Sequence, residues 1–229
     1  MGDLLIEVRD LAFRYPGGAQ ALRGVNFRLH RSETVAVLGA NGSGKTTFLN
    51  HLVGLLSGEG SVRVCGLPVI SANLGRIRQR VGMLFQDADD QIFMPTVEDD
   101  VAFGPLNLGL PADVVRERVE WSLEQVGLNG QRRLPPHNLS AGERRRAALA
   151  GVLATNPEIL LLDEPATFLD PPAKRALVRT LGSLPQSKIL VTHEVDFAAA
   201  LADRAVFFQD GTIIAEGAVL EIADRFEWR

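Results

Sequence analysis

The segment that most constrains the fold of this 229-residue chain runs from residue 39 to residue 46 and reads Gly-Ala-Asn-Gly-Ser-Gly-Lys-Thr. It fits G-x-x-x-x-G-K-S/T, the pattern of a loop that cradles nucleotide phosphates. An apolar run over 34–38 predicts a buried strand before the loop, and residues 47–52 predict the start of a helix after it. A plain glycine-rich turn is the alternative, but strand, loop and helix in this order are the context that a phosphate loop requires. The spacing also differs from the G-x-G-x-x-G of dinucleotide-binding loops.

The residues of this loop have the chemistry that phosphates need. Glycines let backbone N–H groups turn inward, and the helix start adds further N–H groups that face an anion. Lys45 is predicted to place a positive charge at the β- and γ-phosphates, and the Thr46 hydroxyl is predicted to ligate Mg²⁺. The predicted nucleotide-contacting residues are Gly39, Ala40, Asn41, Gly42, Ser43, Gly44, Lys45, Thr46 and Thr47.

Bulk composition describes an ordinary soluble globular protein, with 46% hydrophobic and 23% charged residues. The net charge of −4 gives no general attraction to nucleic acid. The single cysteine, Cys65, excludes an internal disulfide and is interpreted as a small core residue in a strand over 61–65. We find no secretion leader and no apolar run of the roughly 18–20 residues that span a bilayer. Work at a membrane is therefore expected to go through a partner subunit.

Hydrophobic patterning predicts an α/β chain with two kinds of sheet. Residues 4–15 alternate and predict a strand that pairs antiparallel with a second strand over 21–29. Continuous apolar runs predict central parallel strands that are buried on both faces. Asp-Gly at 210–211 predicts a hairpin within 205–214. The other predicted strands cover 81–85, 159–162 and 188–192.

The stretch from about residue 97 to 157 is helical in character, with predicted helices over 113–126 and 143–154. The predicted fold class is therefore α/β, with a mainly parallel core sheet, an antiparallel β edge and an inserted α-helical region.

Two acidic residues, Asp163 and Glu164, follow the predicted strand over 159–162. A carboxylate at this strand end, near the phosphate loop, can hold Mg²⁺ and its waters. Glu164 is placed to orient or deprotonate an attacking water. The alternative is a plain helix cap, because Pro165 follows.

Gln86 and His193 also come directly after predicted strands. An amide at residue 86 can bridge metal, water and the next segment, and a histidine at residue 193 can hydrogen-bond a γ-phosphate. Taken alone, Gln86 means little and His193 would more often be structural or exposed.

The segment 139–143, Leu-Ser-Ala-Gly-Glu, opens a predicted helix. Read locally, Ser140 is an N-cap with Glu143 as its partner in a capping box. Read functionally, the same helix start is an anion site facing a phosphate bound by another subunit. Both interpretations can hold together.

The order of these motifs over residues 4–217 resembles the nucleotide-binding subunit of ATP-binding-cassette (ABC) transporters. Leu-Ser-Ala-Gly-Glu resembles the family signature L-S-G-G-Q, and Phe-Leu-Asp at 168–170 resembles the D-loop. Tyr15 falls where the family stacks an aromatic ring on adenine. The resemblance implies one P-loop NTPase domain over 1–229, with its catalytic core at about 1–90 and 158–229. Residues 91–157 would form the helical signature subdomain.

The resemblance also implies the cofactors ATP and Mg²⁺ and a head-to-tail pair of chains. Glu164, His193 and Gln86 are the implied catalytic residues, and Thr46, Gln86 and Asp163 the implied Mg²⁺ ligands. ATP would be contacted from the opposite chain by Ser140, Ala141, Gly142, Glu143 and Asp170. Two departures, Ala141 for Gly and Glu143 for Gln, are expected to weaken this contact modestly at most.

A narrower similarity covers 85–93 and 95–105, which resemble ATPases of energy-coupling-factor importers, above all the cobalt/nickel subunit. This implies an ATP hydrolase at the cytoplasmic face of a bacterial-type membrane, paired with a second copy or a paralogous ATPase. Integral membrane subunits would select the cargo, with no direct cargo binding here. The implied contacts with those subunits are Asp87, Asp89, Asp90, Gln91 and Phe93.

Other functions stay open at this point. The importer could serve another micronutrient, such as a vitamin. A soluble cassette protein acting on nucleic acid or ribosomes usually has a second cassette or a coiled-coil insertion, and this chain has neither. The three arginines at 144–146 are interpreted as a solvated helix face rather than a nucleic-acid patch. A small-molecule kinase would not need Ser140, Gly142 or His193.

Overall fold

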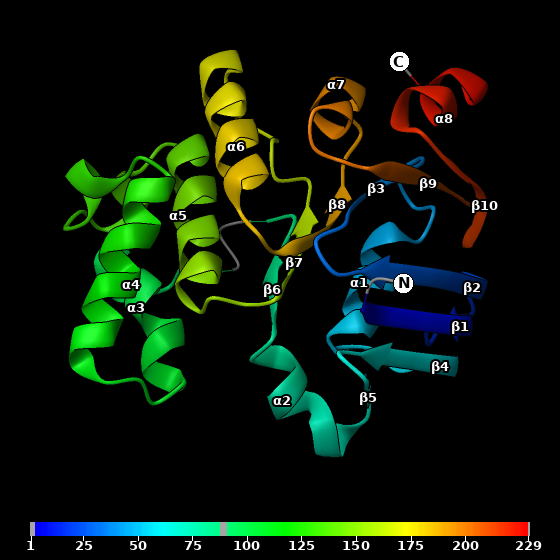
Figure 1. Cartoon of the computed structure of the whole chain (residues 1–229), viewed down its shortest axis with the longest axis horizontal. Helices are drawn as coiled ribbons and strands as arrows, with labels where there is room; N and C mark the ends of the chain where they lie inside the picture. The colour runs from blue at the N-terminus through cyan, green and yellow to red at the C-terminus, as the bar shows by residue number, and fades with distance from the viewer. Residues whose placement is uncertain (1–2, 88–90, 229) are drawn as a thin grey trace.

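The computed structural model of the chain describes residues 3–87 and 91–228, which form two sheets flanked by helices (Figure 1). The first sheet has the order β2-β1-β4-β5 and the second the order β10-β9-β3-β8-β7-β6. The first consists of β1 (Leu4–Arg14), β2 (Gln20–His30), β4 (Glu59–Val64) and β5 (Leu67–Pro68). The second consists of β3 (Thr34–Leu38), β6 (Val81–Leu84), β7 (Ile159–Asp163), β8 (Ser187–Val191), β9 (Arg204–Gln209) and β10 (Thr212–Gly217).

The six-stranded sheet is parallel from β9 through β6, as the continuous apolar runs predict. Every residue of β3, β6, β7 and β8 is buried, because helices cover both faces. Alternate residues of β7 belong to different hydrophobic clusters. Ile159 packs in the cluster that contains residues of α1 (Lys45–Leu52), whereas Leu160 packs in the cluster that contains residues of α5 (Ala141–Ala154). The phosphate-loop helix and the signature helix therefore lie on opposite faces of one sheet.

The antiparallel sheet forms as the alternation predicts, with β1 paired to β2 and to β4. Its inward residues Leu22 and Leu29 are fully buried and share a core with Phe48 of α1. The interpretation of Cys65 as a strand residue is wrong. It lies just after β4 in a turn with φ +50° and is partly buried. The hairpin at Asp210-Gly211 is confirmed, since β9 and β10 pair antiparallel around it.

The helical region contains α3 (Val97–Asn107), α4 (Ala112–Gln125) and α5, which lie together at one side of the central sheet (Figure 1). Helix α5 begins at Ala141, two residues before the predicted start, because Ser140 is its N-cap. The remaining helices are α2 (Leu74–Arg78), α6 (Pro171–Ser183), α7 (Val195–Ala199) and α8 (Val219–Arg225). Within the described ranges, none of the helices is both long and apolar enough to cross a bilayer.

Candidate functional site

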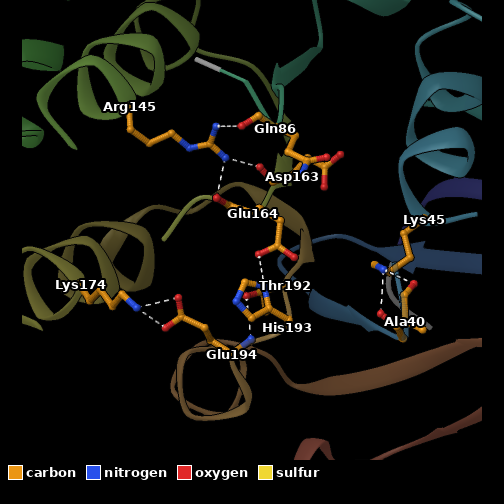
Figure 2. A network of polar contacts seen from close by, with 11 residues as sticks. Ala40, Lys45, Gln86, Arg145, Asp163, Glu164, Lys174, Thr192, His193 and Glu194 are labelled. Atoms are coloured by element: carbon orange, nitrogen blue, oxygen red, sulfur yellow. Dashed lines mark hydrogen bonds and ion pairs between the residues drawn. The ribbon is translucent and has the colours of Figure 1, made fainter. Parts of the chain in front are cut away.

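The phosphate loop connects β3 to α1 and has a backbone that only glycine adopts easily. Gly39 has φ +136°, and a Cβ there would lie 2.2 Å from the carbonyl oxygen of Phe208. The Lys45 side chain is buried, and its Nζ donates to the carbonyls of Gly39 at 2.7 Å and Ala40 at 2.9 Å (Figure 2). Burial lowers the pKa of Lys45, against the opposing effect of the nearby carboxylates of Glu164 and Asp163. The loop therefore holds a buried ammonium group at the start of α1, where positive charge and a helix N-terminus together favour an anion.

The Thr46 hydroxyl donates to the Asp163 carboxylate at 2.7 Å. This contact joins the start of α1 to the end of β7 across 117 residues of sequence. Burial raises the pKa of Asp163, because the carboxylate is almost completely removed from water. A hydroxyl and a carboxylate in contact form a hard-oxygen pair of the kind that Mg²⁺ prefers.

A cavity of about 540 Å³ brings most of the predicted nucleotide residues together. The Tyr15 hydroxyl lies 3.1 Å from Thr47 Oγ1 at this cavity. Of the predicted set, Gly39, Ala40, Ser43 and His193 do not line it. The predicted residues that do line it are Tyr15, Asn41, Gly42, Gly44, Lys45, Thr46, Thr47, Gln86, Asp163 and Glu164.

Glu164 lies at the edge of this cavity with an unusual backbone and a defined partner. Its φ is +51°, and its N–H donates to the carbonyl of Val191 at 2.9 Å. Its Oε2 is 2.9 Å from Nδ1 of His193, which is itself 59% exposed (Figure 2). The helix-cap alternative for the acidic pair is wrong, because α6 begins only at Pro171 and is capped by Asp170. The geometry instead gives an acid paired with a histidine beside the phosphate loop.

The helix start at residue 140 has both features that the sequence predicts locally. The Ser140 Oγ accepts the N–H of Glu143 at 3.3 Å, and the Ser140 N–H donates to Glu143 Oε2 at 2.9 Å, which completes a capping box. These two groups, the Ser140 N–H and hydroxyl, lower the pKa of Glu143. A second cavity of about 480 Å³ lies here, lined by Ser140, Ala141, Gly142, Glu143, Arg146, Phe168, Leu169, Asp170 and Ala173. The two predicted phosphate-contacting groups thus open on separate cavities of one chain.

The segment after Gln86 is tied back to the core by its own side chains. Gln91 accepts the N–H of Phe85 at 2.8 Å and donates to the carbonyl of Met83 at 2.9 Å. Phe93 is 62% exposed and packs edge-on against Phe103 at 4.9 Å between ring centroids. Asp87 is exposed, whereas the predicted contacts Asp89 and Asp90 lie outside the described residues. Among the described predicted contacts, Phe93 and Asp87 are therefore exposed, while the Gln91 side chain is hydrogen-bonded within the chain.

Sequence reasoning missed Arg145, and the interpretation of 144–146 as a solvated face is wrong for this residue. Arg145 is 3% exposed and donates to the carbonyls of Phe85, Gln86, Asp163 and Glu164 (Figure 2). A signal for its burial was present. With α5 starting at residue 141, Arg145 falls on the same helix face as the buried residues Ala148, Leu149 and Val152.

Comparison with known proteins places the chain in a family. The model of the ABC transporter family matches residues 22–167. A putative ABC transporter ATP-binding protein of Geobacter sulfurreducens is 49% identical over 97% of this chain and 90% of its own length. The energy-coupling factor transporter ATP-binding protein EcfA of Methanothermobacter thermautotrophicus is 49% identical over 95% of this chain and 72% of its own length.

Solved structures agree with the sequence relatives. The structure of cbiO1 from Clostridium perfringens, described as part of the ABC transporter complex cbiONQ, superposes with a TM-score of 0.86 at 34% identity. It covers 98% of this chain and 92% of cbiO1. A dimeric ATP-binding cassette bound to ADP and Pi after hydrolysis gives a TM-score of 0.87 at 27% identity, over 94% of this chain and 99% of that one. The chain therefore belongs to the ABC transporter family and is an ATP-binding-cassette ATPase.

Proposed function

We propose that this chain is the ATP-hydrolysing subunit of an energy-coupling-factor importer that takes up cobalt or nickel ions. One observation carries the ATPase part: a buried ammonium, a hydroxyl–carboxylate pair and a histidine-paired glutamate converge at one cavity. The importer type and the cargo are supported by the segments 85–93 and 95–105 and by the similarity to EcfA and cbiO1. An importer for another micronutrient, such as a vitamin, is the alternative that the same similarities leave.

The phosphates of ATP bind to the phosphate loop, where Lys45 exchanges its carbonyl partners for phosphate oxygens. Tyr15, which lines the same cavity, stacks on the adenine ring. Thr46, Asp163 and Gln86 would hold Mg²⁺, because the first two are already in contact and the third lines the same cavity. When bound, Mg²⁺ supplies positive charge that neutralises the triphosphate.

Glu164 is the general base that orients and deprotonates the attacking water. His193 contacts the Glu164 carboxylate through Nδ1 and senses the γ-phosphate. Phosphoryl transfer needs mainly positioning and charge stabilisation, and these residues supply both.

A second ATPase chain completes each site. Ser140, Ala141 and Gly142 line a different cavity from the one lined by the phosphate loop of their own chain. A head-to-tail pair would bring this helix start, together with Asp170, against the phosphates bound by its partner. The partner is a second copy or a paralogous ATPase. The domain extends over 1–229, with 91–157 as its helical subdomain.

The membrane subunits contact the surface that follows Gln86, at the cytoplasmic face of the membrane. Phe93, Phe103 and Leu106 are exposed large apolar side chains on and beside α3, with exposed fractions of 62%, 39% and 58%. The carboxylate of Asp100 accepts the N–H groups of Phe93 at 3.2 Å and Met94 at 3.0 Å, which fixes Phe93 at this surface. An apolar helix end of a membrane subunit would bury these side chains.

Reconstitution tests the proposal. The chain is co-expressed with its membrane subunits, purified in proteoliposomes, and assayed for ATP hydrolysis with Co²⁺, Ni²⁺ or a panel of water-soluble vitamins. We expect stimulation and uptake with Co²⁺ or Ni²⁺, whereas stimulation by a vitamin alone would refute the metal cargo. The Phe93→Glu variant should lose co-purification with the membrane subunits. The control Leu220→Glu, at an exposed position of α8, should retain it.

A further inference from the structure

Arg145 occupies a position between the signature helix and the backbone that carries the catalytic residues. Its Nη1 donates to the carbonyls of Phe85 at 2.7 Å and Gln86 at 2.6 Å. Its Nη2 donates to the carbonyl of Glu164 at 2.5 Å and to that of Asp163. One guanidinium therefore bridges the ends of two neighbouring parallel strands, β6 and β7 (Figure 2).

The four acceptors are unusual partners for a buried charge, because all are neutral backbone carbonyls. A buried guanidinium is costly unless its donors are satisfied, and here four of its five N–H groups have acceptors. Burial lowers the pKa of Arg145, while the carboxylates of Asp163 and Glu164 act in the opposite direction. Arginine stays charged in proteins, so a fixed positive charge lies near the carboxylates of Asp163 and Glu164.

The backbone that Arg145 holds is strained at the residue that matters most. Glu164 has φ +51°, a conformation that residues other than glycine adopt at a cost. Its N–H is bound by Val191 of β8 and its carbonyl by Arg145 of α5, so its peptide groups are held from two sides. Without Arg145 one side would be free, and we expect the Glu164 carboxylate that contacts His193 to shift with the backbone.

We propose that Arg145 is a positioning residue, which holds the backbone of Glu164 and Gln86 in its reactive arrangement and couples that arrangement to the signature helix. This rests on the proposed roles of Glu164 and Gln86 in ATP hydrolysis. Arg145 lies five residues after Ser140 on the same helix. Helix α5 would thereby link two events. When Ser140 contacts a phosphate bound by the partner chain, the position of Glu164 in the chain that contributes Ser140 would be affected.

Steady-state ATPase kinetics of Arg145→Gln test the proposal. We expect kcat to fall at least twentyfold while KM for Mg-ATP stays within threefold, because the hydrogen bonds that the structure gives Arg145 go to carbonyls outside the phosphate loop. In a Glu164→Gln background, measured by single-turnover hydrolysis, the further loss from Arg145→Gln should be clearly smaller than in the wild type, because only the contact with Phe85 and Gln86 still matters there. An equally large loss in both backgrounds would overturn the proposal, since Arg145 would then act independently of Glu164.

Two further variants separate positioning from folding. Arg145→Lys keeps a cation but cannot bridge four carbonyls, so we expect a three- to tenfold lower kcat at unchanged KM. Full activity of a folded Arg145→Lys protein would overturn the proposal, even where Arg145→Gln does not fold. Arg118→Gln is the matched control, because Arg118 donates to the carbonyls of Ala154 and Thr155 at the far end of α5. Its kcat should stay within twofold of the wild type.

Failure of this proposal differs from failure of the proposed function. A wild-type chain that hydrolyses no ATP above the level of Lys45→Ala would refute the ATPase site itself. An active wild type with fully active Arg145→Gln would refute only the positioning role.

Discussion

Neutralising Glu143 should strengthen the ATP-bound dimer. The Glu143 carboxylate accepts the N–H of Ser140 at 2.9 Å and its hydroxyl at 2.8 Å, at the first turn of a 14-residue helix. The Glu143 carboxylate thus accepts the Ser140 N–H and hydroxyl and lies at the positive end of the helix dipole. A partner's phosphate would use these same groups. Glu143→Gln keeps an amide oxygen as a cap but removes the competing charge.

The size of the effect follows from the helix terminus. A negative side chain in the first turn gains about 0.3–1 kcal/mol at low salt, and less as salt screens it. The isolated chain should therefore lose up to about 1 kcal/mol of stability in Glu143→Gln. The dimer should gain a similar amount at each site, up to about fivefold per site in affinity. In a homodimer with two identical sites, the two gains multiply to a roughly 25-fold increase in dimer affinity, as an upper limit at low salt.

Sedimentation velocity in Mg-ATP measures this effect, in a Glu164→Gln background that stops hydrolysis. The dimer dissociation constant should fall at 50 mM salt, with a smaller change at 300 mM. Glu98→Gln is the matched control, because it removes one charge from the first turn of α3, where the partner is Arg132. An unchanged or weaker dimer for Glu143→Gln at low salt would refute the view that Glu143 competes with phosphate.

Three further predictions concern the phosphate loop and the helix that follows it. Lys45→Ala should lose at least a hundredfold in ATP affinity by calorimetry, and wild-type affinity would contradict the phosphate assignment. Gly39→Ala should lower both Tm and ATP binding, because its Cβ would lie 2.2 Å from the carbonyl oxygen of Phe208; an unaltered Tm would show that the loop can shift. Burial lowers the pKa of His51 below 6.5, so the unfolded chain takes up the proton first as pH falls. The free energy of unfolding should then decrease below about pH 6.5, by up to about 1.4 kcal/mol per pH unit. Urea unfolding at pH 7.5 and 5.5 should show a smaller decrease in His51→Leu, and an equal decrease would exclude His51 as its source.

The parts of the fold that were predictable from sequence are those that local patterning decides. Strands β3, β7 and β8 are buried on both faces, so their composition alone distinguishes them from the alternating β1. Asp-Gly at 210–211 sets the hairpin because both residues take positive φ, +49° and +79°. The Ser140 capping box is local as well, since both partners lie within one helical turn.

The parts that were not predictable depend on groups far apart in sequence. Arg145 lies between two arginines, and its acceptors lie 60 and 59 residues before it and 18 and 19 residues after it. The helix periodicity of α5 could indicate that Arg145 is buried, but its four acceptors follow only when the ends of β6 and β7 are known to meet at α5. The contact between Glu164 and His193 is similar, because it requires β7 and β8 to be neighbours in the sheet. A backbone carbonyl also has no sequence signature, so no residue type marks a guanidinium site built from four of them.

Through the contacts of Arg145, helix α5 connects Ser140 to the backbone of Glu164 and Gln86. Helix α5 presents Ser140 at its start and Arg145 about 7.5 Å further along its axis, at 1.5 Å per residue. The guanidinium of Arg145 is bonded to the ends of β6 and β7, and Ser140 lies at a cavity separate from the nucleotide cavity. A helix moves as a rigid body over such a short distance, so a displacement of Ser140 by a phosphate of a partner chain would also displace the backbone of Glu164 and Gln86. If Arg145 is the positioning residue, closure of one site and alignment of the base in the other become a single movement. The two sites of the dimer would then hydrolyse ATP cooperatively. Arg145→Gln should therefore reduce the Hill coefficient for ATP as well as kcat.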